Sequence, residues 1–327
     1  MPEITVIEAV RAALREEMER DPTVFMLGED IGKRGGVFLA TDGLIEQFGE
    51  ERVIDTPLAE ASIGGIALGA AVNGMRPVAE IEFADFIWPA VNQIIGEAAR
   101  VRYGTHGRRT APLVLRVPYG GGVRGGLFHS QSIEVAFAHQ PGLKVVAPAT
   151  PYDAKGLLKS AIRDDDPVIF LEHKRTYRLV KGDVPDGEYT VPIGVAEVKR
   201  AGSDVTVVSY GLVLHYCLEA AATLAEEGID VEVVDLRTLR PLDTDTVLAS
   251  VRKTSKAMIV HEDTKAGGIG GEIAAVIAEY AFEDLDAPVM RVAGPEVPAM
   301  PFSPLLEAEF MPSPEKIAAA IRKLAAY

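Results

Sequence analysis

The sequence predicts an α/β protein with two doubly wound domains, each a mostly parallel sheet with helices on both faces. Short apolar runs alternate with helical patterns along the 327 residues. The runs are continuously apolar, as expected of strands that are covered on both faces. A polar stretch over 173–195 interrupts this alternation, which then restarts. The length agrees with two domains, since one domain holds roughly 150 residues.

The first domain is predicted to begin with a helix, because Thr5 and Glu8 have capping-box spacing and apolar residues recur at helical intervals up to Met18. A Gly- and Ala-rich stretch over 61–75 predicts an internal, tightly packed helix that ends at Gly74. Two more helices are expected over 89–103, with a proline near the first turn, and over 151–162. Strands are expected over 24–30, 51–55, 78–83, 112–117, 143–148 and 167–172.

The second domain repeats the pattern, with strands expected over 204–210, 229–236, 256–263 and 288–293 and helices over 213–227, 243–252 and 271–281. We therefore expect a first domain over 1–180, a linker over 181–195 and a second domain over 196–327.

The composition excludes several classes of protein. A net charge of −15 disfavours nucleic acid and favours a basic protein partner. The single cysteine, Cys217, rules out an intrachain disulfide and fits a reducing compartment. We see no signal peptide and no apolar run long enough to cross a membrane, so a cytoplasmic location is expected.

Candidate site residues follow from the sheet. In open parallel sheets, ligands bind beyond the carboxyl ends of the strands. Glu29, Glu60, Phe86 and His129 all stand in segments that follow predicted strands. Glu60 has two interpretations: an acid in the first turn of a helix is favoured by the macrodipole, and a lone carboxylate beside an apolar Gly/Ala helix is also suited to proton chemistry.

The glycine-rich loop offers an alternative. Gly120, Gly122 and Gly125 match G-x-G-x-x-G, but no helix is expected to open on the third glycine and no acid follows at the required distance. A dinucleotide-binding module is therefore the less favoured interpretation. His129 lies in the same loop and is a candidate for chemistry, and His261 at the end of a later strand is a weaker one.

Six segments together resemble one family: GEDIGKRGGVF, DTPLAEASIGG, EIEFADFIWPA, GGGVRGGLFHSQS, PGLKVVAPATPYDAKGLLKSAIRDDDPVIFLE and VHEDTKAGGIGGEIA. They are similar to the β subunit of the thiamine-diphosphate-dependent 2-oxo acid dehydrogenases, from about residue 3 to the C-terminus. The resemblance implies a pyrimidine-binding domain followed by a transketolase C-terminal-like domain, which helps β subunits to dimerise and docks the acyltransferase.

The resemblance also assigns residues. Glu60 matches the carboxylate that hydrogen-bonds the pyrimidine ring and activates the cofactor, and His129 matches the histidine that assists the transfer to lipoamide. Cofactor contacts are implied for Glu29, Leu58 and Phe86. Glu82 is also counted among the cofactor-binding residues, although it departs from the family, where we expect an uncharged amide. A second acid near Glu60 is expected either to raise a pKa or to turn away.

The resemblance further implies partners. The chain has no G-D-G run, so an α subunit is expected to hold the diphosphate through Mg²⁺ in an α₂β₂ heterotetramer. No metal ligand is assigned to side chains of this chain, although the family often holds K⁺ on backbone oxygens, here at Leu113, Ala161, Ile162 and Asp164. An acyltransferase component with a lipoyl domain is the expected acceptor.

The expected reaction is decarboxylation of a 2-oxo acid, with reductive acylation of lipoamide. A branched-chain substrate is favoured by EIEFADFIWPA and by the tail PFSPLLEAEFMPSPEKI. A pyruvate or acetoin dehydrogenase β subunit is the alternative, and part of a transketolase-like synthase is a further one.

Overall fold

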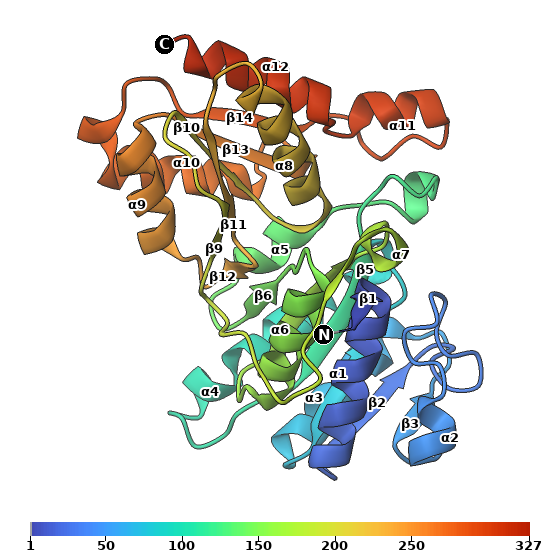
Figure 1. Cartoon of the computed structure of the whole chain (residues 1–327). Coiled ribbons are helices and arrows are strands. Elements are labelled where there is room, and N and C mark those ends of the chain that lie inside the picture. Colours follow the sequence, from blue (N-terminus) through green and yellow to red (C-terminus); the bar gives the residue numbers. More distant parts are fainter. Residues whose placement is uncertain (1) are drawn as a thin grey trace. The chain divides into compact units, whose positions relative to one another are not determined.

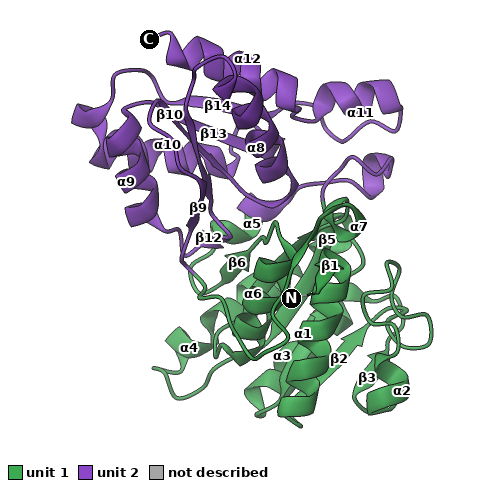
Figure 2. Ribbon diagram, viewed as in Figure 1, with its two compact units in different colours: residues 1–119, 136–193 green, residues 120–135, 194–327 purple. Residues whose placement is uncertain are grey.

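The fold comes from a computed structural model, which describes residues 2–327. The chain forms two compact units (Figure 2). Unit 1 comprises the residues up to Tyr119 together with Ala136–Ile193, and unit 2 comprises Gly120–Val135 together with Gly194–Tyr327. The predicted class, two mostly parallel sheets flanked by helices, is confirmed.

Unit 1 contains a parallel sheet with the strand order β6-β7-β5-β4-β2-β3. A short antiparallel pair, β1 with β8, stands apart from it. The elements of unit 1 are β1 (Glu3–Thr5), α1 (Val6–Arg20), β2 (Val24–Gly28), α2 (Leu44–Phe48), β3 (Val53–Asp55), α3 (Glu60–Val72), β4 (Arg76–Glu80), η1 (Ala84–Phe86), η2 (Trp88–Ala90), η3 (Asn92–Glu97), η4 (Ala98–Arg100), α4 (Val101–Gly104), β5 (Val114–Tyr119), β6 (Lys144–Val146), α6 (Pro151–Arg163), β7 (Val168–His173), α7 (Thr176–Leu179) and β8 (Lys181–Asp183).

The core of unit 1 is built where α1 and α6 pack together on one face of this sheet (Figure 1). Alternate strand residues, among them Met26, Val78 and Phe170, contribute to that core. Helix α3 packs against β4 and β2. The capping box predicted for α1 is present: the Thr5 side chain accepts from the Glu8 N–H, and the Glu8 carboxylate accepts from the Thr5 N–H.

Two predicted helices of unit 1 differ from the expectation. The stretch 89–103 is helical but irregular: 3-10 turns and a π-helical turn precede a short α-helix, α4. Helix α3 is not wholly internal to this chain, because one of its faces is open and Ile66 is 54% exposed. The polar stretch 173–195 also holds regular structure, namely α7 and β8.

Unit 2 contains a second sheet, with the order β14-β13-β10-β11-β9. Its strands are parallel except β9, which pairs with β11 antiparallel at the edge and was not predicted. The elements of unit 2 are η5 (Gly126–Phe128), β9 (Glu197–Arg200), β10 (Val205–Ser209), α8 (Gly211–Ala225), β11 (Val231–Asp235), β12 (Thr238–Arg240), α9 (Thr244–Thr254), β13 (Ala257–Thr264), α10 (Ile269–Tyr280), η6 (Phe282–Asp284), β14 (Met290–Gly294), α11 (Pro304–Phe310) and α12 (Pro314–Ala325). Helix α5 (Glu134–Ala138) begins in unit 2 and ends in unit 1.

Helices pack on the sheet of unit 2 in two pairs, α8 with α12 and α9 with α10. None of the helices within residues 2–327 combines the length and the apolar character that a membrane crossing requires. The predicted boundaries at 180 and 196 remain predictions about functional domains. The compact units of the structure meet at 193/194, and the segment 120–135 is assigned to unit 2.

Candidate functional site

Five of the six predicted site residues lie at one edge of the unit 1 sheet. In the register of the sheet, Gly28 at the end of β2 stands beside Asp55 at the end of β3 and beside Glu80 at the end of β4. The three strands therefore end at the same level. Glu29 follows β2, the segment with Leu58 and Glu60 follows β3, and the segment with Glu82 and Phe86 follows β4.

Glu60 is the first residue of α3, and its carboxylate is half-buried. The residue before it, Ala59, has no side chain that could cap the helix. The loop that leads to Glu60 is held by a hydrogen bond from the Thr56 N–H to the Gly28 carbonyl, at 2.9 Å. Within residues 2–327 the Glu60 carboxylate makes no hydrogen bond or ion pair. Its oxygens are thus available to a group from outside the chain.

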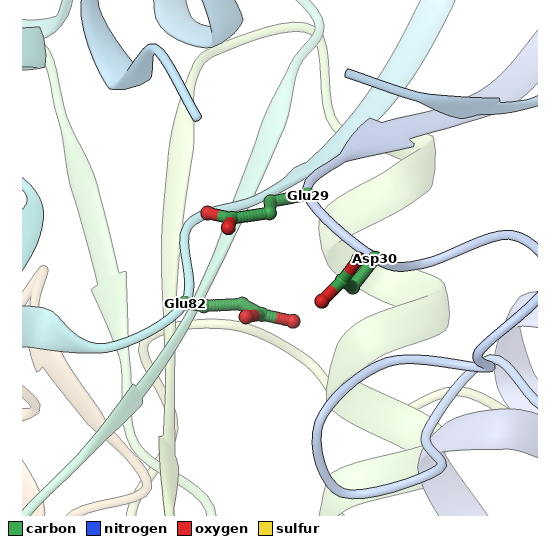
Figure 3. A group of neighbouring side chains, drawn as sticks. All are labelled: Glu29, Asp30 and Glu82. Atoms are coloured by element: carbon green, nitrogen blue, oxygen red, sulfur yellow. The ribbon is translucent and has the colours of Figure 1, made fainter. Parts of the chain in front are cut away.

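Glu29, Asp30 and Glu82 form a compact acidic group, with one carboxylate oxygen of each within 4.8 Å of the others (Figure 3). Asp30 is paired with Arg34 at 2.6 Å, and Glu82 Oε1 accepts the Val37 N–H at 3.3 Å. Burial raises the pKa of Glu82 to about 8, helped by the charges of Glu80, Glu29 and Asp30. Glu82 therefore carries a proton near neutral pH, which is one of the two outcomes expected for a second acid here.

The negative charge of Glu60 acts on Glu29, a member of this acidic group. The pKa of Glu29 is raised by burial first and then by the neighbouring charges of Asp30 and Glu60. Glu80, which acts on Glu82, belongs to a buried cluster beneath the edge of the sheet: Arg116 pairs with Glu80 and, at 2.7 Å, with Glu172.

Apolar side chains complete this edge of the sheet. Leu58 is 69% exposed two residues before Glu60, although a leucine gains free energy by burial. Phe86 is half-buried in η1, and its ring lies 6.2 Å from that of Phe83 in an edge-to-face arrangement. An aromatic ring, an exposed aliphatic side chain and a carboxylate with free oxygens are together suited to a planar heterocycle that carries ring nitrogens.

His129 lies in unit 2, within the segment 120–135, and its side chain is exposed. Gly125 opens only a short 3-10 turn, η5, and the next helix, α5, begins at Glu134. The helix that a dinucleotide fingerprint requires is therefore absent from this loop. His261, the other histidine considered for chemistry, is fully buried against α10 and contributes to the core of unit 2.

Two acids that sequence reasoning missed hold this loop. Glu262 accepts the Gly121 N–H at 2.6 Å, and Glu307 accepts the N–H groups of Gly122 and Arg124 at 2.9 and 3.0 Å. Both acids stand more than 130 residues from their donors, so no local pattern could have revealed the contacts.

The four carbonyl groups named for potassium already accept hydrogen bonds within the chain. The Arg76 guanidinium already donates to the carbonyls of Ile162 and Asp164 at 3.0 and 2.9 Å, and Lys144 pairs with the Asp164 carboxylate. The other two carbonyls accept backbone N–H groups, Leu113 from Val168 and Ala161 from Asp164. Arg76 thus competes with K⁺ for two of the four carbonyls, and the potassium site remains a prediction. We also assign no metal to Glu29, Asp30 and Glu82, because Arg34 already neutralises one of the three.

Two family models match the chain: the transketolase pyrimidine binding domain over residues 2–180 and the transketolase C-terminal domain over 194–317. The 2-oxoisovalerate dehydrogenase subunit beta of Bacillus subtilis is 58% identical over 327 residues, which is 100% of both chains. This chain belongs to the 2-oxo acid dehydrogenase β-subunit family.

Other members of the 2-oxo acid dehydrogenase β-subunit family are also similar to the chain. The pyruvate dehydrogenase E1 component subunit beta of Bacillus subtilis is 49% identical over 324 residues, 99% of each chain. The one from Staphylococcus epidermidis is 48% identical over 293 residues, 90% of each chain. Among solved structures, a split-gene transketolase described as an inactive beta4 tetramer matches with a TM-score of 0.80 and 25% identity, covering 99% of this chain and 98% of its own.

Proposed function

We propose that this chain is the β subunit of a branched-chain 2-oxo acid dehydrogenase, and that Glu60 is its cofactor-activating carboxylate. The substrate class rests on the relative that is named for 2-oxoisovalerate, with 58% identity against 49% for a relative named for pyruvate. A pyruvate dehydrogenase β subunit is accordingly the second candidate. The observation that carries the role of Glu60 is its half-buried carboxylate, whose oxygens have no partner in residues 2–327.

The residues at the carboxyl edge of the unit 1 sheet fit the pyrimidine half of thiamine diphosphate. When bound, this cofactor supplies the nucleophilic carbon and the electron sink for decarboxylation. Glu60 would hold a proton at a pyrimidine ring nitrogen, because a carboxylate that is hydrogen-bonded to this nitrogen favours the protonated ring. Phe86 and Leu58 would pack against the ring and exclude water, and Glu29 would supply further negative charge close to Glu60.

The remaining half of the site would come from a second polypeptide. The chain lacks the G-D-G run, so an α subunit would hold the diphosphate and Mg²⁺, in an α₂β₂ heterotetramer. The open face of α3, with Ile66 54% exposed, supports a protein partner, since exposed apolar surface of this kind is typical of interfaces. His129 would serve the transfer to the lipoyl domain of an acyltransferase component.

The test is Glu60→Gln in the coexpressed α/β complex. Gln cannot share a proton as a carboxylate does, so we expect decarboxylation of 3-methyl-2-oxobutanoate to fall by about 10²- to 10⁴-fold. Glu51→Gln, at an exposed position in the preceding turn, is the matched control and should keep its activity. Full decarboxylation by Glu60→Gln would overturn the assignment. A higher kcat/KM for pyruvate than for 3-methyl-2-oxobutanoate in the wild type would overturn the substrate class alone.

A further inference from the structure

The loop that carries His129 has an unusual backbone. Gly120, Gly122 and Gly126 have φ values of 86°, 76° and 66°, and Arg124 among them has φ 59°. An arginine in the left-handed region is held there by its surroundings, because the chain does not favour this conformation by itself. Contacts made by this loop therefore decide where His129 lies.

Glu307 supplies such a contact at the centre of the loop. It stands in α11 and is only 6% exposed. Its Oε1 atom accepts two N–H groups, from Gly122 at 2.9 Å and from Arg124 at 3.0 Å. One carboxylate oxygen thus bridges the two residues on either side of Val123. Hydrogen bonds from N–H groups to a carboxylate are stronger than those to a neutral acceptor.

Further contacts come from β13 and from the segment before α11. Glu262 Oε1 accepts the Gly121 N–H at 2.6 Å and the Ser132 hydroxyl at 3.1 Å, which ties together the two ends of the loop. A Cβ atom added at Gly121 would lie 2.4 Å from the terminal methyl group of Met300, so a larger residue there would displace that side chain. The segment just before α11 therefore packs closely against the loop. Glu307 fixes the loop backbone at Gly122 and Arg124.

We propose that Glu307 is a positioning residue for His129, which sets the backbone of the 120–132 loop so that the imidazole is held ready for transfer to the lipoyl group. This inference rests on the proposed function, because it needs His129 to take part in that transfer. Glu307 itself touches no reacting atom. It acts through two backbone N–H groups, five and seven residues before His129.

The test compares Glu307→Ala in two backgrounds, wild type and His129→Ala, in the coexpressed α/β complex with its lipoyl domain. The rate measured is reductive acylation of that domain. Glu307→Ala should lower it by roughly 10- to 100-fold in the wild type, since misplacement of a catalytic group by about 1 Å has costs of that size. In the His129→Ala background, the same change should have little further effect. Glu309→Ala on the same helix, at a position that is 83% exposed, is the matched control.

Two further readouts separate positioning from general damage. Glu307→Gln keeps an oxygen that accepts both N–H groups, so it should restore most of the transfer rate. Backbone hydrogen exchange of peptides that contain Gly122 and Arg124 should be faster in Glu307→Ala than in the wild type, with or without cofactor. An equal loss of transfer in both backgrounds, or unchanged exchange, would overturn the inference. Full transfer by the single variant His129→Ala would instead remove the role that the proposed function gives to that histidine.

Discussion

Replacing Glu82 with glutamine should stabilise the complex, and the gain should depend on pH. The folded chain raises the pKa of this carboxyl from 4.5 to about 8, chiefly by burial. For an acid with a raised pKa, the stability it contributes is fully present below about pH 4.5 and is lost as the pH rises to about 8. Gln stays neutral throughout, so the stability of Glu82→Gln relative to the wild type should increase as the pH rises from 4.5 to about 8.

The size of the gain follows from these two pKa values. The difference between 4.5 and about 8 corresponds to about 5 kcal/mol, at about 1.36 kcal/mol for each pH unit. Glu82 is only half-buried, and solvent screening reduces this to about 1–2 kcal/mol. For a chain of this length, that corresponds to a thermal midpoint higher by about 2–6 °C above pH 8.

The assay is calorimetry of the α/β complex without thiamine diphosphate, at one scan rate, between pH 5 and pH 9. The difference between Glu82→Gln and the wild type should be near zero at pH 5 and largest above pH 8. Glu46→Gln removes an exposed carboxylate and should show no such trend. A difference that is constant with pH, or a wild type that is more stable at pH 9, would refute the argument for a protonated Glu82.

Two further perturbations test other features. Burial lowers the pKa of His261 from 6.5 to about 4, so the stability that its neutral form contributes is present above pH 6.5 and is lost towards pH 4, by up to about 3 kcal/mol. Unfolding midpoints of the wild type should therefore fall more steeply with acid than those of His261→Gln, and parallel curves would contradict this. Because Arg76 already donates to the Ile162 and Asp164 carbonyls, exchanging K⁺ for Na⁺ at equal ionic strength should leave the wild-type midpoint unchanged. Arg76→Met should lower the free energy of unfolding by about 1–3 kcal/mol, and the midpoint with it. A wild-type midpoint that rises with K⁺ but not with Na⁺ would show that K⁺ binds the protein.

The parts of the fold that were predicted correctly depend on local patterns. The capping box at Thr5 and Glu8 marked the start of α1, and continuous apolar runs such as that of β2 marked the buried strands. The rule that ligands bind beyond the carboxyl ends of strands then placed Glu29 and Glu60 at one edge of the sheet, as the register confirms.

What the sequence could not predict depends on contacts between distant residues. The Gly/Ala composition of α3 suggested full burial, yet the Ile66 side chain is exposed to solvent, because no element in residues 2–327 covers it. The period of 89–103 indicated one regular helix, and the π-helical turn over Asn92–Glu97 is not visible in that period. The hydrogen bond from Arg76 to the Asp164 carbonyl was not predicted either, because the two residues lie more than 80 positions apart in sequence.

The assignment of 120–135 to unit 2 limits how this chain can be divided. A fragment that ends at residue 193 would keep these residues but lose Glu262 and Glu307, which hold them. A fragment that starts at 194 would keep the two acids and lose the backbone that they bind. Neither fragment would reproduce the native surroundings of His129, so a gene split at that boundary should yield a folded His129 loop only when both pieces are produced together and reassemble.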